Sequence, residues 1–368
     1  MSHVETALDA RMALARVPKT MRAGVYRGKG IVRVEEVPVP EVGDGEVLIK
    51  VACCGVCGTD IKKIFHAYVE PPQILGHEVA GTVVAAGKGV ARWKPGDRVM
   101  SFHHIPCGEC FYCKLRLFSQ CPQYKTTGLT AGFTPNGGGF AEYVKAMPWV
   151  TRGGIVALPG SVSFEQATFI EPVNTIVKAV QKARVAAGET VLVIGCGPVG
   201  LLLLLVSCLE GATIYTSDPM KERREKSVQL GAAEAFDPSG GKLLQEIRAR
   251  TQGRGADAVL VAVPHPEIAA EALAAARPGG RVLLFAANDP VTRITFPAAA
   301  VGIEEKEILG SYSAAVDIQD SAAELVLSGK LPVMALVTHR FPLDRIQQGL
   351  ELAAHPTAQS LKILIEHA

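Results

Sequence analysis

The chain has 368 residues, of which 48% are hydrophobic and 20% are charged, and its formal net charge is +2 at pH 7 with histidine neutral. These values are typical of a soluble globular protein, and the length predicts two domains because one core rarely serves so many residues. The small net charge and the lack of a basic block argue against nucleic acid as a partner, and the longest apolar run, residues 199–209, is too short to span a bilayer.

The first 20 residues mix charged side chains with alanines and lack the unbroken apolar stretch of a signal peptide. We interpret residues 1–20 as an N-terminal extension. The chain contains nine cysteines, an odd number, and four of them lie between Cys107 and Cys121. Without an export signal, this crowding indicates metal ligation rather than disulfides, so we expect a reducing, cytoplasmic location.

Short β-rich runs follow from Met21 onward, separated by turns that contain glycine and proline. The runs are residues 24–26, 31–34, 46–51, 79–86 and 97–100. Many short strands with turns at regular intervals predict a small β-barrel.

After Ser163 strands alternate with helices. We predict helices at residues 164–184, 198–210, 220–230 and 268–276, and strands at residues 190–194, 213–216, 258–263 and 281–286. This alternation predicts an α/β domain with a doubly wound parallel sheet, and the bare apolar strands fit a sheet that is buried on both faces. A last strand, residues 361–365, could return to the first domain.

A glycine motif lies where the strand at 190–194 meets the following helix; it reads Gly195-Cys196-Gly197-Pro198-Val199-Gly200. The first glycine permits a tight turn, the second lets the backbone approach a pyrophosphate, and the third allows close packing of helix and strand. The helix N-terminus, with Pro198 and Val199, would present free amides to the phosphates. The alternative is an α/β domain without a nucleotide, whose glycines serve packing only.

Asp218 ends the next predicted strand, 23 positions after Gly195. A carboxylate there accepts hydrogen bonds from the adenosine ribose and repels a 2′-phosphate, which favours NAD over NADP. Three nearby cations, Lys221, Arg223 and Arg224, leave NADP open as the less favoured cofactor.

Four cysteines, Cys107, Cys110, Cys113 and Cys121, have the spacing C-x2-C-x2-C-x7-C. Thiolates at such spacing complete a tetrahedral shell around a structural zinc ion. This ion would hold together a loop region, about residues 103–125, which we call the lobe. An iron–sulfur cluster is a rival, although the gap of seven residues does not fit its pattern. Unmetallated buried thiols and a nucleic-acid zinc ribbon are further alternatives, and the lack of surrounding basic residues argues against the ribbon.

Upstream of this lobe, Cys57 and His77 together with one acid would form a mixed sulfur, nitrogen and oxygen shell. Three protein ligands plus water is the arrangement of catalytic zinc, because a substrate oxygen can replace the water. From their spacing alone, Cys57 and His77 could equally be ordinary core residues that bind no metal.

The motifs stand in the order found in zinc-dependent medium-chain dehydrogenases, and the chain resembles that family from Met21 to its C-terminus. Besides the cysteine lobe and the glycine turn, they are Cys57-Gly58-Thr59-Asp60, Gly76-His77-Glu78, Gly138-Gly139-Phe140-Ala141-Glu142-Tyr143 and Glu171-Pro172. The last pair makes the chain most similar to the polyol branch, which includes sorbitol, galactitol-phosphate and threonine dehydrogenases. The resemblance implies a GroES-like catalytic domain at 21–172 and 312–368 and a Rossmann domain at 173–311.

The resemblance also implies roles for single residues. Cys57 and His77 would bind the catalytic zinc, with Glu78 or Glu171 as the third ligand and Asp60 orienting His77. The remaining roles are a proton-passing hydroxyl at Thr59, a position beside the nicotinamide at Thr175 and one beside the adenosine ribose at Arg223.

The chain departs from the family pattern at Lys62, where many relatives have a histidine five positions after the zinc cysteine. This departure puts the outer proton relay in doubt, with His66 as a possible substitute. We interpret His103 and His104 as loop residues, because nothing in the sequence places them near the metal.

The combined hypothesis is a dehydrogenase with two zinc ions per chain that transfers a hydride between a secondary alcohol and NAD. The alcohol would be a polyol, a sugar alcohol or an amino alcohol, and the family leads us to expect a homodimer or homotetramer. A zinc-independent reductase of activated double bonds and a non-catalytic NAD-binding protein are the competing readings.

Overall fold

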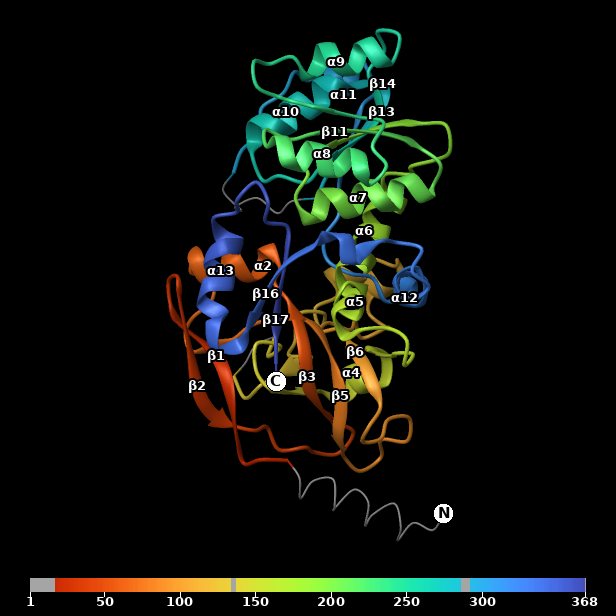
Figure 1. Ribbon diagram of the computed structural model, residues 1–368. Coiled ribbons are helices and arrows are strands. Elements are labelled where there is room, and N and C mark those ends of the chain that lie inside the picture. The colour runs from red at the N-terminus through yellow and green to blue at the C-terminus, as the bar shows by residue number, and fades with distance from the viewer. Residues whose placement is uncertain (1–16, 134–136, 286–291, 368) are drawn as a thin grey trace. The chain divides into compact units, whose positions relative to one another are not determined.

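The computed structural model describes residues 17–133, 137–285 and 292–367 (Figure 1). The chain divides into two compact units. The first comprises Met1–Pro172 and Gln319–Ala368, and the second comprises Val173–Ile318. No helix in the described ranges is long and apolar enough to cross a membrane.

The second unit is built on a six-stranded parallel sheet with the order β12-β11-β10-β13-β14-β15. Its strands are β10 (Thr190–Ile194), β11 (Thr213–Ser217), β12 (Glu234–Phe236), β13 (Ala256–Val261), β14 (Ala276–Leu284) and β15 (Glu307–Gly310). The strand order reverses beside β10, and such switch points, at the carboxyl ends of the strands, are where α/β sheets bind ligands. The doubly wound sheet predicted from the sequence is therefore confirmed.

Helices connect these strands. They are α7 (Pro198–Leu209), α8 (Lys221–Gln229), α9 (Leu243–Arg250), α10 (Pro266–Ala275) and α11 (Ala299–Gly302). The chain turns directly from β10 into α7, so the glycine motif lies at the switch point. Helix α7 is buried along most of its length, which explains its nearly uninterrupted leucine and valine sequence.

The single helix predicted at residues 164–184 is wrong: the structure has α5 (Phe164–Thr168) and α6 (Ile170–Lys182), separated by Phe169. Proline at 172 has no backbone N–H to donate to the carbonyl of Thr168, so the helical ladder cannot continue there. The Thr168 hydroxyl instead donates to the carbonyl of Glu165 at 2.7 Å, which closes α5. The break places Glu171 in the first turn of α6.

The first unit contains curled, mainly antiparallel sheets. They include the part of the chain in which the sequence predicts a small β-barrel. Its long sheet has the order β16-β17-β3-β5-β6-β9, with β8 joined to β3 and β7, and a smaller sheet has the order β2-β1-β4. The strands are β1 (Thr20–Gly28), β2 (Ile31–Pro38), β3 (Val47–Gly55), β4 (Gln73–Ile74), β5 (Glu78–Ala86), β6 (Arg98–Ser101), β7 (Leu129–Thr130), β8 (Tyr143–Ala146), β9 (Ile155–Ala157), β16 (Val337–Pro342) and β17 (Lys362–Glu366).

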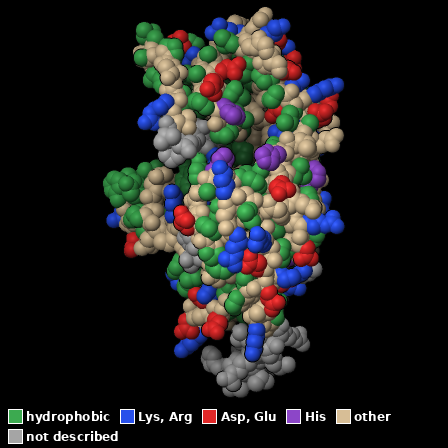
Figure 2. Space-filling view, turned by 90° about the vertical axis from the view of Figure 1, so that its left-hand side faces the viewer, with side chains coloured by type: hydrophobic (Ala, Val, Ile, Leu, Met, Phe, Trp, Pro, Cys, Tyr) green, Lys and Arg blue, Asp and Glu red, His purple; other side chains and the backbone are tan. Residues whose placement is uncertain are grey.

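Strand β3 organises this unit because it pairs with β5, β8 and β17 along its length. The C-terminal strand β17 lies antiparallel beside the end of β3 (Figure 1), as the sequence suggested. Lys362 is its first residue. Short helices α2 (Gly58–Phe65), α3 (Phe111–Lys114), α4 (Pro148–Gly153), α12 (Gln319–Leu327) and α13 (Ile346–Ala354) complete it. On the face shown in Figure 2, acidic and basic side chains are interspersed, as the near-zero net charge suggests.

Candidate functional site

Cys57 lies where the chain leaves β3 and enters α2, and it is the N-cap of that helix. Its Sγ accepts a hydrogen bond from the Thr59 N–H at 3.5 Å, while its own N–H donates to the Asp60 carboxylate at 3.1 Å. This reciprocal arrangement is a capping box made with a cysteine. The thiol is therefore held at a fixed point beside the end of β3.

Glu78 is the first residue of β5, and His77 lies between it and Gly76, whose φ of +88° favours glycine. Asp60 is fully buried and ties this turn to α2, because its Oδ1 accepts from the Gly76 N–H at 3.2 Å. The same Oδ1 lies 3.3 Å from Nδ1 of His77. Although burial opposes it, the charges of Asp60 and Cys57 raise the pKa of His77 well above its ordinary value.

These turns bring three different ligand atoms together: the Cys57 sulfur, a ring nitrogen of His77 and a carboxylate oxygen of Glu78 lie within 4.8 Å of one another. His77 and Glu78 are buried. Sulfur, nitrogen and oxygen in this number form the donor set of a catalytic zinc site, in which three protein ligands leave one corner open. The residues present thus fit a zinc ion.

A lysine that belongs to none of the sequence motifs also lies beside Glu78. Lys362 of β17 forms an ion pair with its carboxylate, and both side chains are almost completely buried. Lys362 Nζ also donates to the carbonyl of Val56 at 3.1 Å. Burial alone would lower the pKa of Lys362, but the charge of Glu78 raises it above its ordinary value.

Gly55 makes room for this pair. A Cβ added at Gly55 would lie 1.9 Å from Oε2 of Glu78 and 2.9 Å from Cε of Lys362, closer than atoms can approach. A side chain at position 55 would therefore displace the carboxylate of Glu78 or the end of Lys362 from their present positions.

Glu171 lies outside the three-residue donor group formed by the described residues, although it is buried and close enough to His77 and Glu78 to sense their charges. Burial is the main cause that raises the pKa of Glu171 to about 7. Its Oε1 lies 3.9 Å from Nδ1 of His103.

The prediction that nothing places His103 near the metal site is wrong. His103 follows β6, and its ring centroid lies 4.6 Å from that of His77. The ring centroid of His104 lies 4.0 Å from that of His103, with the two planes tilted by 45°, and it lies 5.0 Å from that of Tyr124. Burial lowers the pKa of His103 well below its ordinary value. A pair of histidines after a strand carries no spacing signal that would have revealed this cluster of rings.

The four lobe cysteines come together in a separate group. Three of their Sγ–Sγ separations are 3.6, 3.6 and 3.9 Å, for Cys110–Cys113, Cys121–Cys107 and Cys107–Cys113. A tetrahedron of sulfurs around zinc, with bonds of about 2.3 Å, has edges of about 3.8 Å, so these separations fit a closed zinc shell. The lobe has little other core, because its buried cluster consists of the four cysteines with Tyr124 and Phe118.

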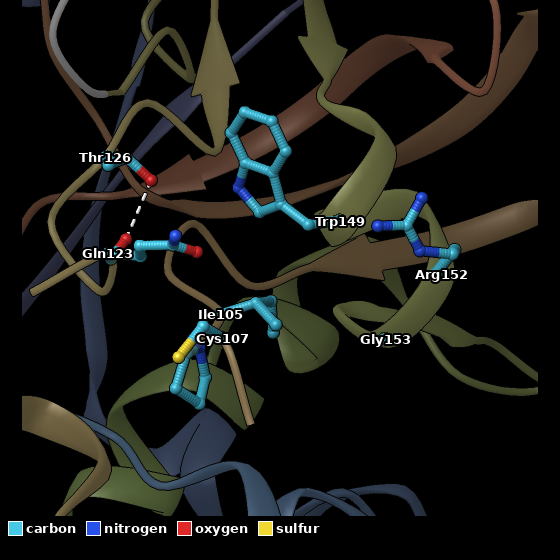
Figure 3. A pocket seen from close by; sticks show the side chains of 8 residues that line it. Ile105, Cys107, Gln123, Thr126, Trp149, Arg152 and Gly153 are labelled. Atoms are coloured by element: carbon cyan, nitrogen blue, oxygen red, sulfur yellow. Dashed lines mark hydrogen bonds between the residues drawn. The ribbon is translucent and has the colours of Figure 1, made fainter. Parts of the chain in front are cut away.

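A pocket borders this lobe (Figure 3). It is lined by Ile105, Pro106, Cys107, Gln123, Thr126, Trp149, Arg152 and Gly153. The Thr126 hydroxyl donates to the carbonyl of Gln123 at 2.7 Å at its edge (Figure 3). None of the three donors Cys57, His77 and Glu78 lines it, so the pocket is separate from the open donor group.

In the second unit the glycine turn has the geometry of a dinucleotide site. Gly195 adopts a φ of +98°, and a Cβ at Gly200 would lie 1.7 Å from the carbonyl oxygen of Gly195. Helix α7 begins at Pro198, with Gly197 as its N-cap and Val199 in its first turn. The close approach of turn and helix leaves their free amides at the carboxyl end of β10, where a pyrophosphate would bind.

Asp218 is buried at the end of β11, and its carboxylate accepts hydrogen bonds from the N–H groups of Cys196 and Met220, both at 2.8 Å. Arg224 donates to the backbone carbonyls of Asp218 at 2.7 Å and Pro219 at 2.9 Å, and it pairs with Asp237 at 3.0 Å. Arg223 lies beside the glycine turn, since its Nη1 is 3.8 Å from the position of a Cβ at Gly197. Of the other predicted residues, Thr175 lies in α6, whereas Thr59 and Lys62 lie on α2 and His66 caps its end.

Family models match both halves of the chain. One, described as the alcohol dehydrogenase GroES-like domain, matches residues 43–159, and one described as zinc-binding dehydrogenase matches residues 198–328. Sorbitol dehydrogenase of Bacillus subtilis is 30% identical over 355 residues, which cover 95% of this chain and 98% of the relative. L-threonine 3-dehydrogenase of Pyrococcus furiosus is 33% identical over 335 residues, covering 86% and 90%.

Solved structures agree with this assignment. A protein of Sinorhizobium meliloti bound to NADP has a TM-score of 0.85 at 28% identity, and the match covers 95% of this chain and 100% of that one. These matches span almost the whole length of each relative, so they include both units of this chain. The chain belongs to the zinc-dependent medium-chain dehydrogenases, in the polyol branch with sorbitol and threonine dehydrogenases, and is an oxidoreductase of secondary alcohols.

Proposed function

We propose that the chain oxidises a polyol, sugar alcohol or amino alcohol with NAD, and that Cys57, His77 and Glu78 hold the catalytic zinc. The observation that carries this proposal is the convergence of one sulfur, one nitrogen and one oxygen donor within 4.8 Å. These atoms come from two turns that are fixed to each other by Asp60. The donor set is thus organised by the fold before a metal binds.

Glu78 is the better candidate for the third ligand than Glu171. Its oxygen is part of the compact donor group, and its carboxylate forms a buried ion pair with Lys362. Glu171 has no such lysine in contact among the described residues, and burial favours its protonated form at pH values below about 7. We therefore propose that Glu171 faces the substrate and does not bind the zinc ion.

Zinc, when bound, would supply Lewis-acid chemistry that lowers the pKa of a substrate hydroxyl, and NAD would accept the hydride from the carbinol carbon. The residues of the chain supply the rest. Thr59, exposed two positions after Cys57, would take the hydroxyl proton and pass it toward solvent. Lys62 lies one turn later on α2, on the same face of the helix as Thr59. It would be the next group to receive the proton.

We assign a second, structural zinc ion to Cys107, Cys110, Cys113 and Cys121, as their tetrahedral sulfur separations support. Four thiolates leave no corner for a substrate, so this ion would serve the lobe only. The proposal therefore requires two zinc ions per chain. All nine cysteines are free, which agrees with a reducing compartment such as the cytoplasm.

We propose NAD as the preferred cofactor and NADP as the weaker one. The buried carboxylate of Asp218 lies where the adenosine ribose of a dinucleotide would bind, and it would repel a 2′-phosphate. Arg224, one of the three nearby cations, is already paired with Asp237 and donates to the carbonyls of Asp218 and Pro219. Thr175 on α6 would contact the nicotinamide of the cofactor, and Arg223 beside the glycine turn would contact its adenosine ribose.

We propose a homodimer, or a tetramer built from it, in which the open edge of the second unit's sheet pairs with its copy. Strand β15 lies at the end of the strand order and exposes Ile308, and Ile303 close by is 81% exposed. An exposed edge with apolar side chains is a template for pairing with another chain. Analytical ultracentrifugation would show a dimer or tetramer if this is correct, and a monomer if it is not.

The function is tested with the zinc-loaded protein, NAD and a panel of polyols, sugar phosphates and amino alcohols, followed by NADH absorbance. The proposal expects turnover of at least one of them, loss of turnover in Cys57→Ala, and two zinc ions per chain by mass spectrometry of metals. Turnover that survives complete removal of zinc would contradict it.

A further inference from the structure

The pocket beside the lobe has no part in the reaction proposed above. Its volume is about 580 Å³, within the range of about 300–1,000 Å³ that is typical of binding sites for small molecules. All of its lining residues belong to the first unit. The pocket is therefore a candidate site for a ligand that is neither the alcohol nor the dinucleotide.

Three segments of the chain meet at this pocket (Figure 3). Residues 105–107 run up to and include the first lobe cysteine, and residues 123–126 follow the last one, whereas Trp149 and Arg152 belong to helix α4. Because these two residues are three positions apart, they lie on one face of the helix. The pocket thus has one wall on α4 and its other walls on the two ends of the lobe.

The polar side chains of the pocket offer hydrogen-bond donors. In the described part of the chain, no hydrogen bond or ion pair occupies the guanidinium of Arg152, the indole N–H of Trp149 or the side-chain amide of Gln123. Figure 3 shows the side chains of Gln123 and Arg152 pointing toward the space between them. Among the described residues that line the pocket, Arg152 alone is an aspartate, glutamate, lysine or arginine. An anionic group is the chemical complement of this lining.

The charge of the lobe itself does not oppose an anion. Between residues 103 and 125 the chain has three cations, Lys114, Arg116 and Lys125, and one acid, Glu109. This excess of positive charge offsets the roughly two negative charges of a zinc ion with four thiolates. The positive charge of Arg152 on α4 then decides the sign at the pocket.

The rest of the lining favours a flat apolar body on the ligand. Ile105 and Pro106 form an apolar wall, and the indole of Trp149 is half-buried. Ile105 and Trp149 pack against the main core of the first unit, which holds them in place. A partly covered indole offers its face to another ring. An aromatic ring that carries a carboxylate or a phosphate would use both the apolar wall and the guanidinium.

Helix α4 is firmly joined to the body of the first unit. The carbonyl of Thr151 accepts a hydrogen bond from Nε1 of Trp93 at 3.0 Å, and the Thr151 hydroxyl donates to the carbonyl of Ala146 at 3.2 Å. Both bonds are buried, whereas the lobe has little core besides its own cysteines. A ligand that binds only when lobe and helix are in this arrangement stabilises it by mass action.

We propose that this pocket binds an aromatic carboxylate or an aromatic phosphate, and that its occupation stabilises the lobe against loss of zinc. The anionic group pairs with Arg152 and accepts from the amide of Gln123, while the ring lies against Trp149. The effect on the lobe rests on the structural zinc ion proposed above. Binding of the ligand is independent of the proposed reaction.

Binding is measured by calorimetric titration of 2-naphthoate into the zinc-loaded protein saturated with NADH, which keeps the probe out of the dinucleotide site. The uncharged match is 2-naphthamide, and 2-naphthyl phosphate, titrated in parallel, shows which anionic group the pocket prefers. We expect the wild-type protein to bind 2-naphthoate about tenfold more tightly than 2-naphthamide, because hydrogen bonds between charged groups are stronger than neutral ones.

Three variants locate the probe. Arg152→Gln should weaken binding of 2-naphthoate about tenfold and change that of 2-naphthamide less than about twofold. Trp149→Leu should weaken binding of both probes about fivefold, since it removes the ring contact. Lys114→Gln is the matched control, because it removes a positive charge from the lobe outside the pocket, and it should change binding less than about twofold. Equal affinities of the wild-type protein and Arg152→Gln for 2-naphthoate would overturn the proposal.

The effect on the lobe is measured as the rate of zinc release to a coloured chelator, in the Cys57→Ala background where the lobe ion is the one expected. Saturating 2-naphthoate should slow this release about tenfold, and it should have no effect when Arg152→Gln is added. Unchanged release at saturation would overturn the stabilising role. Neither measurement needs turnover, so their failure leaves the proposed oxidation of alcohols standing, and failure of that oxidation leaves both results valid.

Discussion

The buried ion pair between Lys362 and Glu78 makes the sharpest prediction about stability. We expect Lys362→Met to destabilise the metal-free protein, because it leaves the carboxylate of Glu78 charged, 1% exposed and without its cation. Removing one partner of a buried pair costs about 3–5 kcal/mol, a large share of the roughly 5–15 kcal/mol that stabilises an ordinary domain. Loss of the hydrogen bond to the Val56 carbonyl adds to this cost.

Zinc should reduce this penalty. A metal ion that binds Glu78 takes over the neutralising role of Lys362, and a ligand that binds only the folded state stabilises it by mass action. The difference in unfolding free energy between wild type and Lys362→Met should therefore be larger in chelator than with excess zinc. Removing both charges, in Glu78→Gln with Lys362→Met, should recover most of the loss in chelator, because a neutral pair leaves no uncompensated buried charge.

The assay is urea unfolding followed by tryptophan fluorescence. The chain has two tryptophans, Trp93 and Trp149, and both lie in the first unit, so the signal reports the unit that holds the pair. Lys362→Arg is the control that keeps the positive charge and should lose much less. If Lys362→Met in chelator were within about 1 kcal/mol of wild type, the reasoning about this pair would be refuted.

Three further predictions concern other parts of the chain. Cys110→Ser should lower the zinc content from two ions to one per chain and make the lobe, which has little core besides its thiols, susceptible to protease; an unchanged zinc content would argue against the assignment. Asp218→Asn should lower the preference for NAD over NADP about tenfold in kcat/KM, since it removes the charge that repels a 2′-phosphate; an unchanged ratio would mean that another group selects the cofactor. Burial lowers the pKa of His367 to about 4, whereas the unfolded chain takes up this proton near pH 6.5, so stability is lost as the pH falls from 6.5 towards 4. Between pH 7 and pH 5 the variant His367→Asn should lose about 2 kcal/mol less than wild type, and equal losses for the two proteins in urea unfolding at these pH values would contradict this.

Local signals in the sequence were sufficient for much of the fold. The glycine motif directly after an apolar strand predicted the turn at Gly195, and the bare apolar strand at 190–194 appears in the structure with the same bounds. The break before Glu171 was predictable too, because Pro172 cannot donate the hydrogen bond that a continuous helix needs. That signal was outweighed by the long helical pattern on both sides.

Residues brought in from distant parts of the chain could not be predicted. Lys362 reaches Glu78 only because β17 pairs with the end of β3, and a lone lysine in a C-terminal strand has no pattern that indicates burial. His103 is near His77 only because the loop after β6 runs beside the start of β5. In both cases tertiary pairing decides the environment, whereas periodicity and motif spacing describe near neighbours.

Diffraction data collected at the zinc absorption edge from crystals of the zinc-loaded protein would test the central claim most directly. We predict two anomalous peaks per chain, one surrounded by the four lobe sulfurs and one about 2.0–2.3 Å from the donor atoms of Cys57, His77 and Glu78. A second peak that lies away from Cys57 and His77, or the absence of that peak in a fully active preparation, would contradict the account.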